Sequence, residues 1–145
     1  MQQFRFRLQR ILQWQERLCR IEEDKLRERL AEIAETENKL ASLFAERAAI
    51  EEEFSAQTAM TPSDLRALAA FRRKSILDQQ ALEQESRKRR SALDAQRQKL
   101  LSERRRLQMI EKLRTRALEE HTRAADRELE ALSLESYLST WISRS

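Results

Sequence analysis

The 145-residue sequence contains no glycine and only one proline, Pro62. Glycine supplies the positive-φ positions that tight turns and helix C-caps prefer, so a compact domain with many turns almost always contains several glycines. A chain without glycine therefore turns rarely. The same absence argues strongly against phosphate-binding loops, dinucleotide fingerprints and nucleophile elbows, because each of these motifs requires glycine at fixed positions.

Other chemistry-bearing residues are also scarce. The single cysteine, Cys19, excludes a disulfide within the chain, and the only histidine, His121, has no second histidine or cysteine nearby to complete a metal site. No apolar run reaches the length of about 18 residues that a membrane span needs, and the first residues lack the apolar segment of a signal peptide. We therefore expect a cytosolic protein that is not an enzyme and has no catalytic residue, metal or cofactor.

The residues that are present favour long helices. Charged residues make up 37% of the chain and aromatic residues only 6%, which is typical of a coiled coil. From Phe4 onward, apolar residues recur mostly at intervals of three, four and seven, the pattern of a helix that buries one narrow stripe. The stripe expected in this first helix contains Leu8, Ile11, Leu18, Leu26, Leu30, Ile33, Leu40 and Phe44.

The pattern breaks near residues 57–61, where a second helix start can be recognised. Thr61 is suited to the N-cap, Pro62 to the first helical position and Asp64 to the positive end of the helix dipole. The sequence therefore predicts one helix over about 4–56, a turn over about 57–61 and a second helix over about 62–142.

Pairing the two apolar stripes across this turn predicts how the helices meet. Antiparallel partners must have residue numbers with a nearly constant sum, and pairs such as Leu26 with Leu93 and Leu8 with Ile110 sum to 119 and 118. We expect an all-α fold, a two-helix antiparallel coiled-coil hairpin forming a single domain over residues 1–145. The first helix should run out near position 114, which leaves Thr115–Ile142 as a C-terminal helix overhang.

The overhang carries an apolar stripe that an isolated helix cannot bury, so we expect it to bind another protein. Its apolar residues include Ala117, Leu118, Ala124, Ala131, Leu132, Tyr137, Leu138, Trp141 and Ile142.

Two basic clusters, 87–90 and 104–106, are dense enough to contact phosphates and leave a nucleic-acid-binding helix as an alternative. They lie where the helix should be paired, whereas a basic zipper places its basic block at one end.

Two stretches resemble a known family. The start, residues 4–12 (FRFRLQRIL), is similar to the F-x-F-x-L-x-K/R-V/I-L opening of the flagellar export protein FliJ family, whose chains are of closely similar length. Near the end, residues 111–114 (EKLR) and 119–121 (EEH) are similar to that family's E-K-L-K/R and E-E/K-Y/H stretches. The resemblance spans most of the chain.

The resemblance implies a coiled coil similar to the central stalk of rotary ATPases. The region near both chain ends would enter the hexameric ring of the flagellar type III export ATPase, with Phe4, Phe6, Leu118, Leu132, Tyr137, Leu138 and Trp141 as contacts. One face early in the second helix would touch the cytosolic domain of the export gate: Phe71 matches the family's central phenylalanine, and Leu68, Ser75 and Leu82 share its face.

The family is also thought to escort export chaperones, so these are expected partners, whereas no small-molecule substrate is expected. The implied location is the cytoplasm, peripherally associated with the inner membrane at the flagellar base. Two alternatives besides nucleic-acid binding stay open: the equivalent stalk of a virulence type III secretion system and a generic structural coiled coil. The ATPase that the chain recovers in a pull-down would distinguish them.

Overall fold

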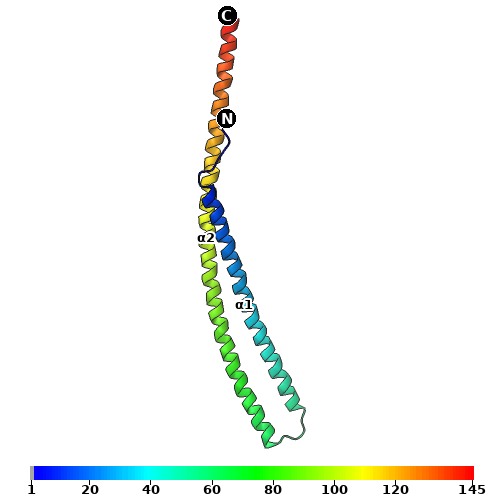
Figure 1. The fold of residues 1–145 in the computed structure, drawn as a ribbon. Coiled ribbons are helices and arrows are strands. Elements are labelled where there is room, and N and C mark those ends of the chain that lie inside the picture. Colours follow the sequence, from blue (N-terminus) through cyan, green and yellow to red (C-terminus); the bar gives the residue numbers. More distant parts are fainter. Residues whose placement is uncertain (1) are drawn as a thin grey trace. The chain divides into compact units, whose positions relative to one another are not determined.

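A computed structural model describes residues 2–145. It contains two helices, α1 (Gln9–Ser55) and α2 (Pro62–Arg144), and the described residues form no strand (Figure 1). The two long helices pack against each other as an all-α helical hairpin, which confirms the predicted fold class. Each helix is held by its own backbone hydrogen bonds, and the contact between the helices determines which side chains are buried.

The connection between the helices is built without any positive-φ residue among those described. At its end, Thr61 Oγ1 accepts a hydrogen bond from the Asp64 amide at 3.2 Å, and the Asp64 carboxylate accepts one from the Thr61 amide at 3.1 Å. These reciprocal bonds are a capping box, and they satisfy two amides at the start of α2. The predicted start of the second helix at Pro62 is confirmed.

Replacing Thr61 with alanine is expected to lower the unfolding free energy by about 1 kcal/mol, because one helix-start amide loses its side-chain acceptor. Chemical denaturation followed by circular dichroism measures the change. Ser63→Ala is the matched control, since Ser63 is an exposed neighbour that lies outside the capping box. Equal stability of the two variants would mean that the capping box contributes nothing.

The expected start of the first helix at Phe4 is wrong, because α1 begins at Gln9. Phe4 and Phe6 are half-buried, whereas Arg5 and Arg7 are exposed. This alternation has the period of two that an extended backbone gives, not the 3.6-residue period of a helix. The phenylalanine and arginine spacing thus already contained the signal for a non-helical start.

The chain divides into two compact units. Unit 1 combines the residues up to Ile21 with Leu101–Ser145, and unit 2 is Glu22–Leu100. The buried side chains of unit 1 are Leu12, Gln15, Cys19 and Ala125. Those of unit 2 are Thr36, Leu68, Ser75, Ser86, Leu93, Gln96 and Leu100. In both units polar side chains are buried beside apolar ones, which is unusual for an interface between two helices.

The apolar stripe expected in the first helix is partly wrong. Ile11, Leu30 and Phe44 are 45–48% exposed, whereas Gln15 and Thr36 are buried. No buried side-chain nitrogen or oxygen among the described residues lacks a hydrogen-bond partner, so burial of the polar groups is compensated. The helices therefore turn several large apolar side chains to the outside and hold polar ones between them.

Candidate protein-binding surfaces

In unit 1 the non-helical N-terminal segment lies along α2 (Figure 1). His121 Nε2 donates a hydrogen bond to the Gln2 carbonyl at 3.0 Å, and the rings of Phe4 and His121 meet edge to face with centroids 5.5 Å apart. An extended backbone advances about 3.3 Å per residue, against 1.5 Å for a helix, so few residues cover a long stretch of α2. Gln2 and Ala125 line the same small pocket, and Ala125 is buried.

This segment shifts the start of the overhang. The prediction that α2 is unpaired from Thr115 is wrong, because it assumed a helical N-terminus with a shorter reach. Beyond Ala125 every residue from Asp126 to Ser145 is exposed. We call Asp126–Ser145 the free tail.

The free tail contains seven exposed large apolar side chains, a dense set for twenty solvent-facing residues. They are Leu129, Leu132, Leu134, Tyr137, Leu138, Trp141 and Ile142, which are 47–67% exposed. Four of the residues expected to contact the ATPase, Leu132, Tyr137, Leu138 and Trp141, are among them. The other three lie in the paired part of unit 1: Leu118 is 41% exposed, and Phe4 and Phe6 are half-buried.

The apolar side chains of the free tail occupy two sides of the helix. Leu129 and Leu132 follow Ala125 at steps of four and three, so they continue the face that is covered earlier in α2. Ala131, Leu134, Leu138 and Trp141, which we call the tail stripe, follow one another at steps of three and four on another side. The site residues expected from the sequence did not include Leu129 or Leu134, although the spacing from Ala131 would have found Leu134.

A second exposed stripe lies at the start of α1. Ile11, Trp14 and Ile21 are 47%, 60% and 48% exposed, and Leu18 between them is half-buried. Their steps of three, four and three repeat the spacing of a coiled-coil seam. This outer stripe was not recognised from the sequence, because the expected inward stripe already included Ile11 and Leu18.

The residues expected to bind the export gate lie on the inward side of α2 in unit 2. Leu68 is 6% exposed and Ser75 is 2% exposed, whereas Phe71 and Leu82 are half-buried. Steps of three, four and seven place all four on one face, and α1 covers that face. A partner that meets the closed hairpin can reach only the edges of Phe71 and Leu82.

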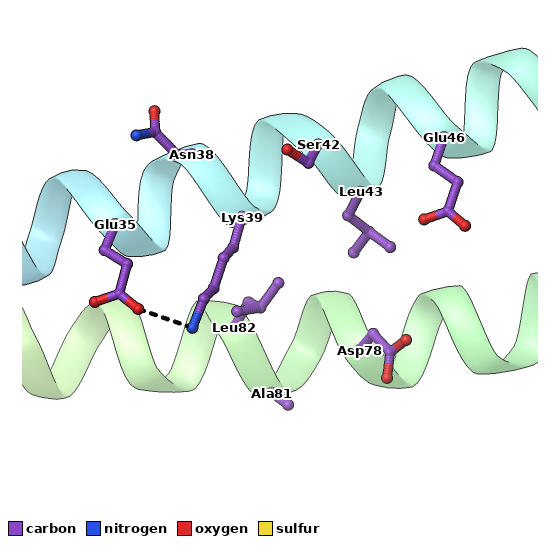
Figure 2. A pocket seen from close by; sticks show the side chains of 9 residues that line it. All are labelled: Glu35, Asn38, Lys39, Ser42, Leu43, Glu46, Asp78, Ala81 and Leu82. Atoms are coloured by element: carbon purple, nitrogen blue, oxygen red, sulfur yellow. Dashed lines mark ion pairs between the residues drawn. The ribbon is translucent and has the colours of Figure 1, made fainter.

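A groove of about 630 Å³ opens beside Leu82 (Figure 2). Leu43 of α1 and Leu82 of α2 point into the space between the helices and form its apolar floor, and Ser42 and Ala81 also line the groove. Its rim is acidic, formed by Glu35, Glu46 and Asp78, and Lys39 forms an ion pair with Glu35 at 3.1 Å. The groove thus combines an apolar floor with an excess of carboxylates.

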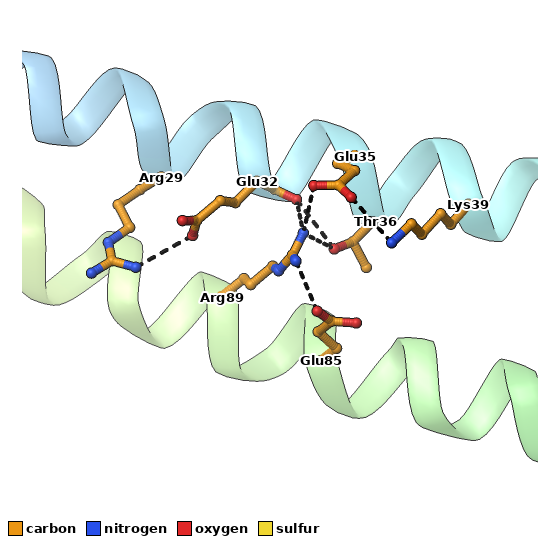
Figure 3. A network of polar contacts seen from close by, with 7 residues as sticks. All are labelled: Arg29, Glu32, Glu35, Thr36, Lys39, Glu85 and Arg89. Carbon is orange, nitrogen blue, oxygen red and sulfur yellow. Dashed lines mark hydrogen bonds and ion pairs between the residues drawn. The ribbon is translucent and has the colours of Figure 1, made fainter.

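A polar network centred on Arg89 joins the two helices of unit 2 (Figure 3). Its guanidinium donates hydrogen bonds to the Glu32 carbonyl and, at 2.8 Å, to Thr36 Oγ1. It also forms ion pairs with Glu85 at 2.8 Å and Glu35 at 3.5 Å. Thr36 is fully buried, so Arg89 supplies a polar partner where water cannot reach.

Two further contacts between the helices have matching geometry. In unit 1, Gln15 donates to both the carbonyl and the carboxylate of Glu103, at 3.0 and 2.5 Å. In unit 2, Gln96 donates in the same way to Glu22. The amide of Gln96 is the main cause that lowers the pKa of Glu22 below its ordinary value, since it stabilises the ionised carboxylate.

Near the hairpin end, Arg72 holds Glu51 by two hydrogen bonds of 2.6 and 2.7 Å. This contact lowers the pKa of Glu51 from its ordinary value of 4.5. A carboxyl with a lowered folded-state pKa stabilises the fold above its unfolded pKa, and this stabilisation is lost as the pH falls through the folded value.

The unfolding free energy is therefore expected to be higher for the native chain than for Arg72→Gln near neutral pH. The difference should shrink as the pH falls below about 4.5, because protonated Glu51 no longer attracts the guanidinium. Urea denaturation at a series of pH values measures it. Arg73→Gln is the control, since Arg73 is exposed and donates a hydrogen bond to a carbonyl of its own helix. A difference in unfolding free energy that stays constant between pH 7 and pH 3 would contradict a stabilising contact between Arg72 and ionised Glu51.

Two searches of the described residues, one for metal-binding side-chain clusters and one for membrane-spanning helices, found neither. No group of three or more histidine, cysteine, aspartate or glutamate side chains is placed to hold a metal ion. Within residues 2–145, neither helix has an apolar stretch that would suffice to cross a membrane. Comparison with protein-family models, curated proteins and solved structures found no match to this chain.

Proposed function

We propose that the chain is a component of the flagellar type III protein export apparatus that binds the export ATPase ring as a central stalk. In this role it also links the ring to the cytosolic domain of the export gate and to export chaperones. The observation that carries the proposal is the free tail, which exposes seven large apolar side chains next to a family-like N-terminus.

The distribution of these side chains favours a partner that surrounds the tail. Leu129 and Leu132 lie on one side of α2 and the tail stripe lies on another. A flat groove would bury one side and leave the other in water, whereas the opening of a ring can bury both. Exposed apolar area of this extent is typical of a surface that another protein covers.

The gate contact is proposed for Phe71 and Leu82, the two half-buried members of the expected set. Leu82 also lines the groove, so a gate segment with basic and apolar side chains would meet both an apolar floor and carboxylates there. Leu68 and Ser75 serve the contact between α1 and α2 in this proposal.

Removal of Asp126–Ser145 tests the stalk role. The truncated chain should lose binding to the purified flagellar export ATPase hexamer in a pull-down, because the proposed contact surface is gone. Its thermal unfolding should stay close to that of the full chain, since none of the removed residues is buried. Leu77→Ser is the control, because Leu77 is also apolar and 65% exposed but lies in unit 2.

Binding that survives the truncation would refute the stalk role. Recovery of a virulence-system ATPase instead of the flagellar one would favour the equivalent stalk of that system.

For the nucleic-acid alternative, Arg89 weighs against a phosphate-binding role of the 87–90 cluster, since its guanidinium is engaged with Thr36 and Glu85. Absence of a duplex DNA shift at low salt would remove that alternative.

A further inference from the structure

The tail stripe is exposed, and its spacing is the same in both directions along the helix. Its members stand at 131, 134, 138 and 141, so they are separated by steps of three, four and three. We propose that the tail stripe binds the tail stripe of a second copy, with the two free tails antiparallel about a twofold axis near Ser136. The inference concerns the chain by itself, so it does not rest on the proposed function.

The sizes of the side chains favour the antiparallel direction. Facing residues then have numbers that sum to 272, so Ala131 faces Trp141 of the second copy and Leu134 faces Leu138. The smallest member of the stripe thus packs on the largest, which fills the space between the helices evenly. A parallel pair would place Trp141 on Trp141 and Ala131 on Ala131, so one layer would be overfilled and another would be left open.

The charges beside the tail stripe favour the same direction. Glu130, Tyr137 and Arg144 follow one another at steps of seven on one flank of the stripe, and Glu135 lies on the other flank. In an antiparallel pair like flanks face each other, so each Glu130 lies opposite Arg144 of the second copy and two ion pairs form. All four side chains are exposed in the single chain and are therefore available to a second copy.

Like-charge contacts also distinguish the two directions. In a parallel pair each Glu130 would lie opposite Glu135 of the second copy, which gives two repulsive contacts and no attractive one. The antiparallel pair opposes only Glu135 to its own copy, once, at an exposed position where water weakens the repulsion. The charge pattern therefore identifies a second copy in the antiparallel direction as the occupant of the stripe.

The position of the axis lets the contact form from the free tails alone. Ser136 is at the middle of Asp126–Ser145, so each free tail ends beside the residues at which the free tail of the second copy begins. The N-terminal segment is attached at His121, before the free tail starts. The two tail contacts are related by the twofold axis, so the assembly closes at two copies.

The overlap covers only about two heptads, so the dimer should be weak and reversible. α2 is already helical through Arg144, and association therefore does not have to order the backbone. Leu129 and Leu132 lie on another side of α2 and stay outside the contact. A protein that surrounds the tail would have to displace the second copy.

Sedimentation velocity over a concentration series of the purified full chain tests the proposal. The weight-average mass should rise from one chain towards two and go no further. Trp14→Phe leaves Trp141, which is 62% exposed in the single chain, as the only tryptophan. Its emission should shift to shorter wavelength over the same concentration range, because the second copy covers the indole ring.

Two aspartate substitutions separate this contact from nonspecific association. Leu134→Asp should abolish dimerisation, because it places a charge against Leu138 of the second copy. Ser133→Asp adds the same charge on another side of the helix and should leave the affinity unchanged. Neither residue is buried in the single chain, so both variants should keep the helical circular dichroism spectrum of the native chain.

A charge exchange tests the register. Glu130→Arg and Arg144→Glu should each weaken the dimer about tenfold, because an attraction becomes a repulsion in both copies of the ion pair. The double variant should restore the native affinity. Glu135→Arg with Arg144→Glu makes the same change in total charge but should not restore it, since Glu135 lies on the other flank.

A chain that stays monomeric at every concentration, with unshifted Trp141 emission, would overturn the proposal. So would a dimer insensitive to Leu134→Asp, or a double charge exchange of Glu130 and Arg144 that fails to restore affinity. The export ATPase is absent from these assays, so either proposal can fail while the other stands.

Discussion

Replacing Leu100 with alanine is expected to lower the unfolding free energy by about 2–4 kcal/mol. Leu100 is 3% exposed, the lowest value of any buried apolar residue described. Its removal withdraws apolar area from the contact between the helices and leaves a space that two long helices cannot close without shifting along each other. Thermal and chemical denaturation monitored by circular dichroism measure the loss.

The neighbouring leucine provides a matched control. Leu101 is 43% exposed, so Leu101→Ala removes the same atoms from the same helix but from a site that water already reaches. Its cost should stay near or below about 1 kcal/mol. Similar losses for both variants would show that Leu100 is not part of a packed interior.

Replacing Arg89 with alanine is expected to cost about 2 kcal/mol, because hydrogen bonds that involve a charged group are each worth about 1.5–3 kcal/mol and part of the loss is offset by water. Thr36 would lose its partner on the other helix, although its hydroxyl still bonds the Glu32 carbonyl at 3.2 Å. Glu35 and Glu85 are 55% and 44% exposed, so both are resolvated without a large penalty.

Arg90→Ala is the control for this variant. Arg90 is 65% exposed, and it forms a long ion pair of 3.8 Å with Glu37. Its removal should change the unfolding free energy by less than about 0.5 kcal/mol. If both arginine variants were equally stable, the network would have no stabilising role.

A double replacement tests whether the Arg89 network acts mainly to fix the register of the two helices. Arg89→Met with Thr36→Val substitutes apolar groups for both partners, a change that is often neutral or stabilising when a buried polar contact is removed as a whole. If the network acts mainly to fix the register of the helices, the double variant should be as stable as the native chain. It should then show less protection from hydrogen exchange around Thr36, because neighbouring registers become accessible.

Much of the hairpin could be predicted from the sequence. Thr61, Pro62 and Asp64 determine the start of α2 through local chemistry, which needs no tertiary information. The constant sum of paired residue numbers also agrees with the structure, since Gln15 meets Glu103 and Glu22 meets Gln96. Both pairs sum to 118.

The identity of the buried side chains could not be predicted in the same way. Ile11 and Leu12 are both apolar and differ in direction by about 100° around the helix, so hydropathy alone cannot tell which faces inward. Leu12 faces inward because Gln15, on the same side of α1, forms a hydrogen bond to Glu103 of α2. That contact depends on a residue 88 positions away in the sequence. An unpaired C-terminal end of α2 was predicted, but the residue at which it begins was not, because that depends on how far the N-terminal segment reaches along α2.

The way that N-terminal segment is attached makes the length of unpaired helix depend on whether the segment stays in place. A hydrogen bond and one ring contact join it to His121, and its backbone forms no helix or strand, so it belongs to the part of the fold that opens at least cost. Detachment would uncover Ala117, His121 and Ala125 while α1 and α2 kept their other contacts. A binding partner that competes for His121 would thereby extend its own binding surface on α2 by two or three helical turns.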